Sequence, residues 1–173
     1  QLPLQQRLQL ARLLVALADG DKQLTAQLWN EMGFVTKSNN PYVLNKWAEF
    51  RFKGGDPHAL MDELGGAGLF QENLNRLDPV VSDPSEFVMA FRMMALIRGS
   101  AIGLGDLHAD SSKNWRERAI GFLAKHGEPP PQTVSGRRTD YTITKDLKLV
   151  RRSLLRRATS RNNNFGGGAA GTG

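Results

Sequence analysis

The stretch from His108 to Asn114 contains residue types that phosphoryl transfer requires, an aspartate that acts as a base and an asparagine that holds a metal ion. Three residues separate Asp110 from Asn114, whereas four separate the corresponding pair in a protein-kinase catalytic loop. No Asp-Phe-Gly sequence, which would supply a further metal ligand, follows this stretch. We therefore predict that Asp110 or Ser111 caps a helix and that this loop is structural.

The remaining candidates for chemistry are also better explained as structural residues. His58, His108 and His126 lie far apart in the sequence, so they do not form a metal-ligand set. Gly103-Leu104-Gly105 follows a predicted helix rather than a strand, which indicates the end of a helix and not a phosphate-binding loop. Cysteine is absent, which excludes a thiolate nucleophile, a Cys-ligated metal and a disulfide. The sequence predicts no catalytic, cofactor-binding or metal-binding residue in this chain.

The positive charge of the chain is concentrated near its C-terminal end. Between Arg137 and Arg161 there are nine Lys or Arg residues and two acidic residues. The residues before this segment contain fourteen Lys or Arg residues and fifteen acidic residues. The pI of about 10.0 therefore reflects one segment and not the whole chain. Apolar residues recur at three- or four-residue spacing within it, which predicts a basic amphipathic helix over residues 140–158. These apolar residues are Leu147, Val150 and Leu154.

Six basic residues of this predicted helix are the candidate membrane-binding or partner-binding residues. They are Lys145, Lys148, Arg151, Arg152, Arg156 and Arg157. Three partners remain open: an anionic membrane surface, the groove of a protein partner, or the phosphates of an RNA. Tyr141 is the only aromatic residue of the segment, so base stacking is weak and RNA is the least favoured of the three. A solvated helix without a specific role is the fourth interpretation.

The first third of the chain predicts three helices. Apolar residues at helical spacing predict a helix from about Leu4 to Ala18, ended by Asp19-Gly20-Asp21. Asp21 is placed to cap a second helix that Gly33 closes in the left-handed conformation. Asn40-Pro41 predicts the start of a third helix that runs to about Phe52.

The later part of this region predicts three more helices. Asp56-Pro57 predicts a short helix, and a final helix begins near Ser111 and closes at Gly127. Asp83-Pro84-Ser85-Glu86 predicts the cap of a helix that is apolar on almost every side, which we expect to be the buried central element. Its methionines are interpreted as core packing, with a lipid or quinone pocket as the alternative. These methionines are Met89, Met93 and Met94.

These patterns predict an all-α fold with four consecutive parts. A helical domain spans residues 1–127, a proline-rich linker 128–139, the basic helix 140–158 and a disordered Gly/Asn tail 159–173. No alternation with a period of two residues predicts a strand, and no apolar run is long enough to cross a membrane. The sequence begins with Gln and not Met, which we interpret as a processed product or a fragment.

Two stretches resemble the C-lobe of the UbiB-like atypical kinases, the aarF-domain-containing or ADCK group. The first runs from Leu2-Pro3 through Asp19-Gly20-Asp21 to Met32-Gly33-Phe34, and it is similar to the family helix that follows the metal-binding Asp-Phe-Gly. The second contains Leu96-Ile97-Arg98-Gly99, Gly103-Leu104-Gly105 and Trp115 to Ala119, and it is similar to the end of the family domain. The resemblance extends over roughly residues 2 to 126 and implies a helical, kinase-like C-lobe.

The resemblance places the family's catalytic apparatus upstream of Gln1. The Ala-rich nucleotide loop, the Lys-Gly-Gln motif, the ion-pair Lys and Glu, the catalytic Asp and the Asp-Phe-Gly have no counterpart here. ATP and magnesium are therefore expected only with an upstream kinase segment, and this chain alone is not expected to be an enzyme. The resemblance implies a non-catalytic part of a membrane-associated kinase or ATPase of a chloroplast or mitochondrion, linked to quinone or prenyl-lipid metabolism. The alternatives are a structural subunit of a large organellar assembly and an RNA-contacting assembly protein.

Overall fold

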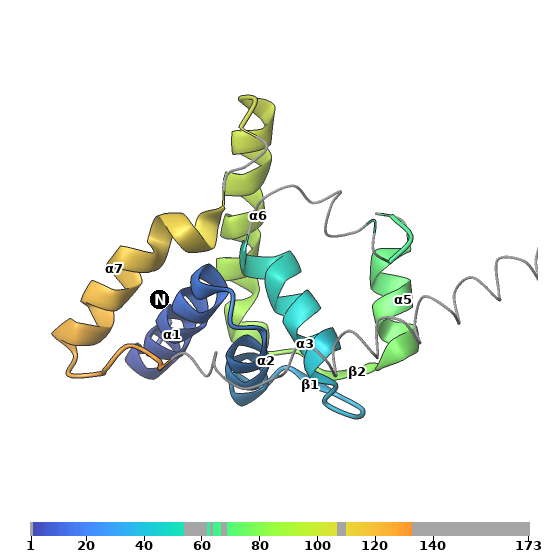
Figure 1. The fold of residues 1–173 in the computed structure, drawn as a ribbon, viewed down its shortest axis with the longest axis horizontal. Coiled ribbons are helices and arrows are strands. Elements are labelled where there is room, and N and C mark those ends of the chain that lie inside the picture. Colours follow the sequence, from blue (N-terminus) through green and yellow to red (C-terminus); the bar gives the residue numbers. More distant parts are fainter. Residues whose placement is uncertain (1, 54–61, 63, 67–68, 107–109, 133–173) are drawn as a thin grey trace, which may run out of the picture. The chain divides into compact units, whose positions relative to one another are not determined.

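The computed structural model describes residues 2–53, 62, 64–66, 69–106 and 110–132 of this chain. The chain divides into two compact units, residues 1–136 and 137–173, and every described residue belongs to the first. The described residues form six α-helices, two short irregular helices and one two-stranded sheet (Figure 1). The predicted all-α fold is confirmed. The predicted basic helix and its six candidate binding residues lie outside the described residues.

The first two helices form where the sequence predicts them. Helix α1 (Leu4–Asp19) ends at Gly20, whose φ of 73° is the left-handed conformation that glycine adopts without strain. Helix α2 (Lys22–Glu31) is capped by Asp21, whose Oδ1 accepts a hydrogen bond from the Leu24 backbone N–H at 3.0 Å. Both predicted caps are confirmed, so a one-glycine turn places α2 directly against α1.

The third helix begins as predicted and ends differently. Helix α3 (Pro41–Ala48) is capped by the Asn40 side chain, which accepts a hydrogen bond from the Tyr42 N–H at 2.9 Å. The predicted α-helix to Phe52 is wrong in its last turn, because residues Glu49–Lys53 form a π-helical turn, η1. The wider π turn directs Arg51 towards the aromatic core.

Aromatic side chains make up the centre of the core around η1. Trp29 and Phe52 are at most 1% exposed, and the Trp29 ring stacks on Phe34 with ring centroids 5.1 Å apart. The guanidinium of Arg51 lies over four rings and also donates two hydrogen bonds of 2.6 Å to the Asp83 carboxylate. These four rings belong to Trp29, Phe34, Trp47 and Phe91. Arg51 thus stabilises the core through cation–π contacts and a bidentate ion pair.

A short sheet, which the sequence does not predict, joins two loops. Strand β1 (Val35–Thr36) pairs antiparallel with β2 (Val80–Ser82), which follows α5 (Phe70–Leu77). Strands of two and three residues are too short to show an alternating pattern.

Asp78, at the C-terminal end of α5, ties this sheet to the start of α3. Its carboxylate accepts hydrogen bonds from the Thr36 hydroxyl at 2.6 Å and from the backbone N–H groups of Ser38 and Asn40 at 2.8 Å. Burial acts to raise the pKa of Asp78, but these hydrogen bonds outweigh it and lower the pKa below its ordinary value. The ionised carboxylate is therefore the form that holds this corner of the fold together.

Helix α6 (Val88–Gly103) corrects a prediction about the core. The sequence predicts a buried central helix, but no residue of α6 is buried, and Met89 and Leu96 are 64% and 65% exposed. The interpretation of the methionines as core packing is wrong for Met89 and Met93. The helix contacts η1 along one side only, through Phe91 and Arg98. Its other apolar side is uncovered in the described part of the chain.

The start of α6 also differs from the prediction. The sequence predicts Asp83 as the helix cap, but Ser85–Phe87 form a 3-10 turn, η2, before the α-helix begins at Val88. The Asp83 carboxylate binds Arg51 instead. A bidentate ion pair with a distant arginine takes the place of a local cap. A pattern of neighbouring residues does not reveal such an ion pair.

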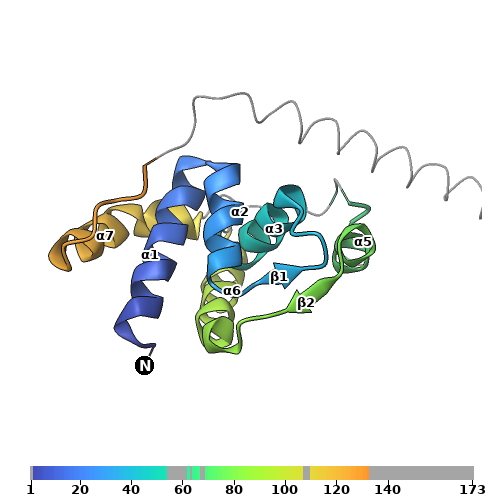
Figure 2. The ribbon, with the colours of Figure 1, turned by 90° about the horizontal axis from the view of Figure 1, so that it is seen from below.

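Helix α7 (Ser111–Lys125) completes the described fold. Asp110 caps it by accepting hydrogen bonds from the N–H groups of Ser112 and Lys113, and Gly127 closes it with a φ of 72°. The predictions of this helix and of a structural role for Asp110 are confirmed. Helix α7 lies beside α1 in both ribbon views (Figure 2). Of the predicted short helix that begins at Asp56-Pro57, most lies outside the described residues.

Candidate functional site: the groove between α1 and α7

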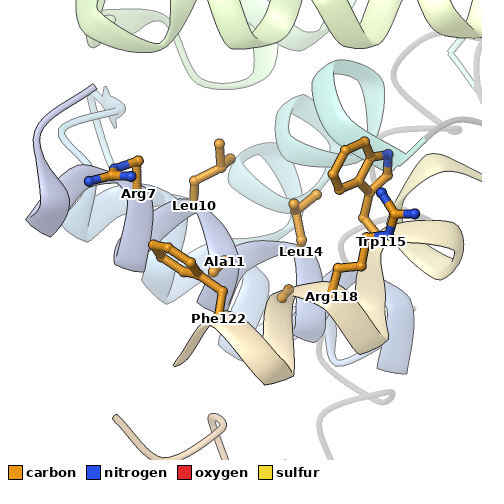
Figure 3. A pocket seen from close by; sticks show the side chains of 8 residues that line it. Arg7, Leu10, Ala11, Leu14, Trp115, Arg118 and Phe122 are labelled. Atoms are coloured by element: carbon orange, nitrogen blue, oxygen red, sulfur yellow. The ribbon is translucent and has the colours of Figure 1, made fainter. Parts of the chain in front are cut away.

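A groove of about 340 Å³ lies between α1 and α7 (Figure 3). Each helix contributes four side chains with the same spacing of i, i+3, i+4 and i+7, which places all four on one face of the helix. From α1 these are Arg7, Leu10, Ala11 and Leu14; from α7 they are Trp115, Arg118, Ala119 and Phe122. The two alanines are buried and leave room between the helices. The groove therefore has an apolar lining with an arginine from each helix.

Two other arginines hold the helices together. Arg12 of α1 forms an ion pair with Glu128, just after α7, and Arg116 of α7 donates a hydrogen bond of 2.7 Å to Asp19 of α1. The hydrogen bonds from Arg116 to Asp19 and Glu117 raise the pKa of Arg116 above its ordinary value. One pair joins α1 to α7 and the other joins α1 to the residues just after α7, so both connect the two walls of the groove.

Among the residues that the structure describes, the two groove arginines have no such partner. Within the described ranges, no carboxylate lies within ion-pair distance of Arg7 or Arg118. Each guanidinium lies over an aromatic ring, Arg7 over Phe122 at 5.7 Å and Arg118 over Trp115 at 5.4 Å. The rings orient both cations along the groove while leaving their N–H donors available.

This arrangement supports binding and not bond-making chemistry. None of the eight lining residues is a nucleophile, a general acid or a general base at neutral pH. An apolar surface with a cation at each end suits an apolar ligand that carries negative charge. Among the described residues, no group of three or more His, Cys, Asp and Glu side chains is arranged to hold a metal ion.

The six sequence-predicted binding residues are not among those that the structure describes. Residues Lys145 to Arg157 lie outside the described part of the chain, as do His58 and His108. His126 is exposed, and its Nδ1 lies 2.8 Å from the Phe122 carbonyl oxygen. In the segments that the structure describes, no helix is long and apolar enough to cross a membrane.

Sequence reasoning missed the groove, although the sequence contains a signal for it. The identical i, i+3, i+4, i+7 spacing at residues 7–14 and 115–122 is visible in the sequence. Each pattern alone is typical of an ordinary amphipathic helix. The pairing of α1 with α7 was needed to show that the two faces form one surface.

Comparison with known proteins gives no match. No protein-family model, no curated protein and no solved structure matches this chain.

Proposed function

We propose that this chain is the non-catalytic, helical C-lobe-like portion of a UbiB-like atypical kinase or ATPase. The observation that carries this proposal is the contact between the two stretches that resemble the family. Leu10 and Leu14 belong to the first stretch, and Trp115 and Ala119 belong to the second, about one hundred residues later. These four side chains line one groove. A shared interface is expected if both stretches are parts of one inherited domain.

Arg98 of the second stretch offers additional support. It donates a hydrogen bond of 3.0 Å to the Phe50 carbonyl oxygen and lies over the Phe50 ring at 5.7 Å. Burial lowers the pKa of Arg98, as expected of a cation partly removed from water. Arg98 thus attaches the Arg-Gly segment of α6 to the core, which gives this motif a structural role.

The resemblance places the proposed parent protein at the membranes of a chloroplast or mitochondrion, in quinone or prenyl-lipid metabolism. The nucleotide and magnesium sites would lie in a segment that precedes Gln1 in the family order. The role of this chain would be to support that segment and to bind partners. The exposed apolar side of α6 is a surface of the kind that another part of a larger protein covers.

Peptide mapping and intact mass of the native protein test this proposal. Peptides with Lys-Gly-Gln and Asp-Phe-Gly motifs in the same polypeptide would support it, and magnesium-dependent ATP hydrolysis by that longer polypeptide is then expected. The 173-residue chain alone, assayed beside it, is expected to be inactive. A native polypeptide without those motifs would contradict the proposal.

A second candidate function is that of a non-catalytic interaction subunit in a large assembly. The exposed α6 side chains favour it, because apolar side chains such as Met89, Met93 and Leu96 on one surface are typical of a protein contact. A native mass of about 19.1 kDa together with stable co-purifying proteins would support this candidate over the kinase portion. An RNA-contacting role rests on residues 145–157 alone and predicts binding that weakens steeply with salt.

A further inference from the structure

We propose that the groove between α1 and α7 binds an acidic amphipathic α-helix of a partner protein. The bound helix would place an apolar stripe between α1 and α7 and would present Asp or Glu side chains to Arg7 and Arg118. This binding surface is independent of the proposed kinase relationship, because it depends only on residues of these two helices.

The shape of the groove favours a helix as the occupant. On each wall the lining residues extend over i to i+7, which corresponds to about two turns or roughly 10 Å of helix. Two helices in contact leave a groove that a third helix can occupy, with its side chains between their ridges. Leu10, Leu14 and Phe122 would contact the apolar stripe of such a helix.

The charges of the groove favour an acidic partner. Arg7 and Arg118 lie near opposite ends of the groove in Figure 3, and none of its lining residues is acidic. Arg12 and Arg116 have carboxylate partners, whereas Arg7 and Arg118 contact aromatic rings and, among the described residues, no carboxylate. A guanidinium beside an apolar surface binds a carboxylate through charge-assisted, often bidentate hydrogen bonds.

The same charges disfavour two other occupants, the basic segment 140–158 and a second copy of the groove. The predicted helix over residues 140–158 has an apolar stripe, but its Lys and Arg side chains would repel Arg7 and Arg118. A second copy that presented the same groove would also bring arginines together. An acidic helix from a different protein satisfies both the apolar and the charged residues.

The experiment uses the full 173-residue chain and two designed helical peptides. Both peptides have the same apolar stripe and about fourteen residues, which is four helical turns. One has Glu at the flanking positions and the other has Lys at the same positions. Trp115 is 40% exposed and lines the groove, while Trp29 and Trp47 are buried, so a change in tryptophan fluorescence when a peptide is added is assigned to Trp115. Calorimetry gives the dissociation constants.

The Glu peptide is expected to bind at least about tenfold more tightly than the Lys peptide, with an affinity that falls as salt is added. In the Arg7→Glu/Arg118→Glu double variant this preference is expected to reverse, so that the Lys peptide binds more tightly. Arg92→Glu on α6 is the control for a charge reversal outside the groove, because Arg92 is exposed and does not line the groove. The control variant should keep the original preference. Circular dichroism verifies that all variants are folded, and the reversal itself cannot arise from unfolding.

Three outcomes would overturn this proposal. The first is equal binding of both peptides, which would show an apolar surface without charge selection. The second is a preference that the double variant does not change. The third is no peptide binding, whether or not sodium decanoate changes the Trp115 fluorescence; a change with decanoate would indicate a site for small amphiphiles and not for a helix.

Discussion

Trp29 and Leu96 are both large apolar residues in α-helices, but their surroundings differ completely. Trp29 of α2 is 0% exposed, whereas Leu96 of α6 is 65% exposed. Helix α2 packs against α1 and α3, and the Trp29 ring contacts Phe34 and Phe52. Helix α6 packs mainly against the short turns η1 and η2.

The comparison shows that an apolar sequence does not by itself indicate a buried helix. An amphipathic helix such as α2 needs neighbours on one side, and α1 and α3 provide them. A helix that is apolar on almost every side requires neighbours all around it. In the part of the chain that the structure describes, α6 has neighbouring elements on one side. The apolar excess of α6 is therefore a property of a surface and not of this core.

The largest difference between the two regions is expected from truncating their apolar side chains. Trp29→Ala removes a fully buried ring and should lower the free energy of unfolding by about 3 to 5 kcal/mol. Met89→Ala, at an exposed position of α6, should change it by less than about 0.5 kcal/mol. Urea denaturation followed by circular dichroism measures both. Equal losses would mean that α6 is buried in solution and would contradict the comparison.

The next largest effect is expected at Asp78, in the buried polar corner beside the core. Asp78→Asn keeps the shape but replaces the charged acceptor of three hydrogen bonds, which should cost about 1 to 3 kcal/mol of unfolding free energy. Glu86→Gln, at an exposed position of η2, is the control and should have little effect. Thermal denaturation compares the two variants. A stable Asp78→Asn protein would show that the backbone N–H groups are satisfied equally well by an amide.

The pH dependence of stability sharpens the same test. The pKa of Asp78 is lower in the folded chain than in the unfolded chain, so the unfolded chain takes up its proton first as the pH falls. The stabilisation by Asp78 is fully present above the unfolded pKa of about 3.9 and is lost as the pH falls through the lower folded pKa. Between neutral pH and about pH 3, the free energy of unfolding should therefore fall less in Asp78→Asn than in the original chain. Denaturation curves at each pH measure it. Identical pH profiles would exclude Asp78 as a contributor.

A smaller effect is expected from changing the arginine inside the aromatic cluster. Arg51→Lys keeps the charge but loses the planar stacking and the bidentate contact with Asp83, at a cost of about 1 to 2 kcal/mol. Arg92→Lys on the exposed side of α6 should cost almost nothing. Chemical denaturation measures both substitutions. If the two variants are equally stable, Arg51 acts only through its charge.

The smallest effect on stability, with a clear effect on association, is expected from a charge on α6. Leu96→Glu should change the free energy of unfolding by less than about 0.5 kcal/mol, because the side chain is 65% exposed. It should lower the binding of an apolar dye and any self-association, because it interrupts the exposed apolar surface. Light scattering and dye fluorescence measure these changes, with Lys113→Glu on α7 as the control. Unchanged dye binding would place the apolar surface elsewhere.

The elements that the sequence predicts correctly are those determined by neighbouring residues. Asp21, Asn40 and Asp110 each cap a helix through hydrogen bonds to backbone N–H groups two or three residues later. Gly20 ends α1 through its own backbone conformation. Such interactions are local, so residue types and spacing are sufficient to find them.

The features that the sequence does not predict depend on distant residues. Asp83 has the local signature of a helix cap, but Arg51, thirty-two residues earlier, takes its carboxylate. The short strands form because the loop after α2 lies beside the loop after α5, which no local pattern encodes. The groove has the same origin, since its two walls come from opposite ends of the described chain. Tertiary contacts therefore determine both the sheet and the candidate site.

The π turn at the end of α3 has a consequence for insertions and deletions. A π turn contains one residue more than the equivalent stretch of α-helix, so η1 corresponds to a single extra residue within residues 49–53. Deleting one residue there would restore regular α-helix, and the side chains of this turn would then take other directions around the helix axis. Arg51 and Phe52 could then no longer both keep their positions. The chain thus tolerates a change of residue type in this turn better than a change of its length.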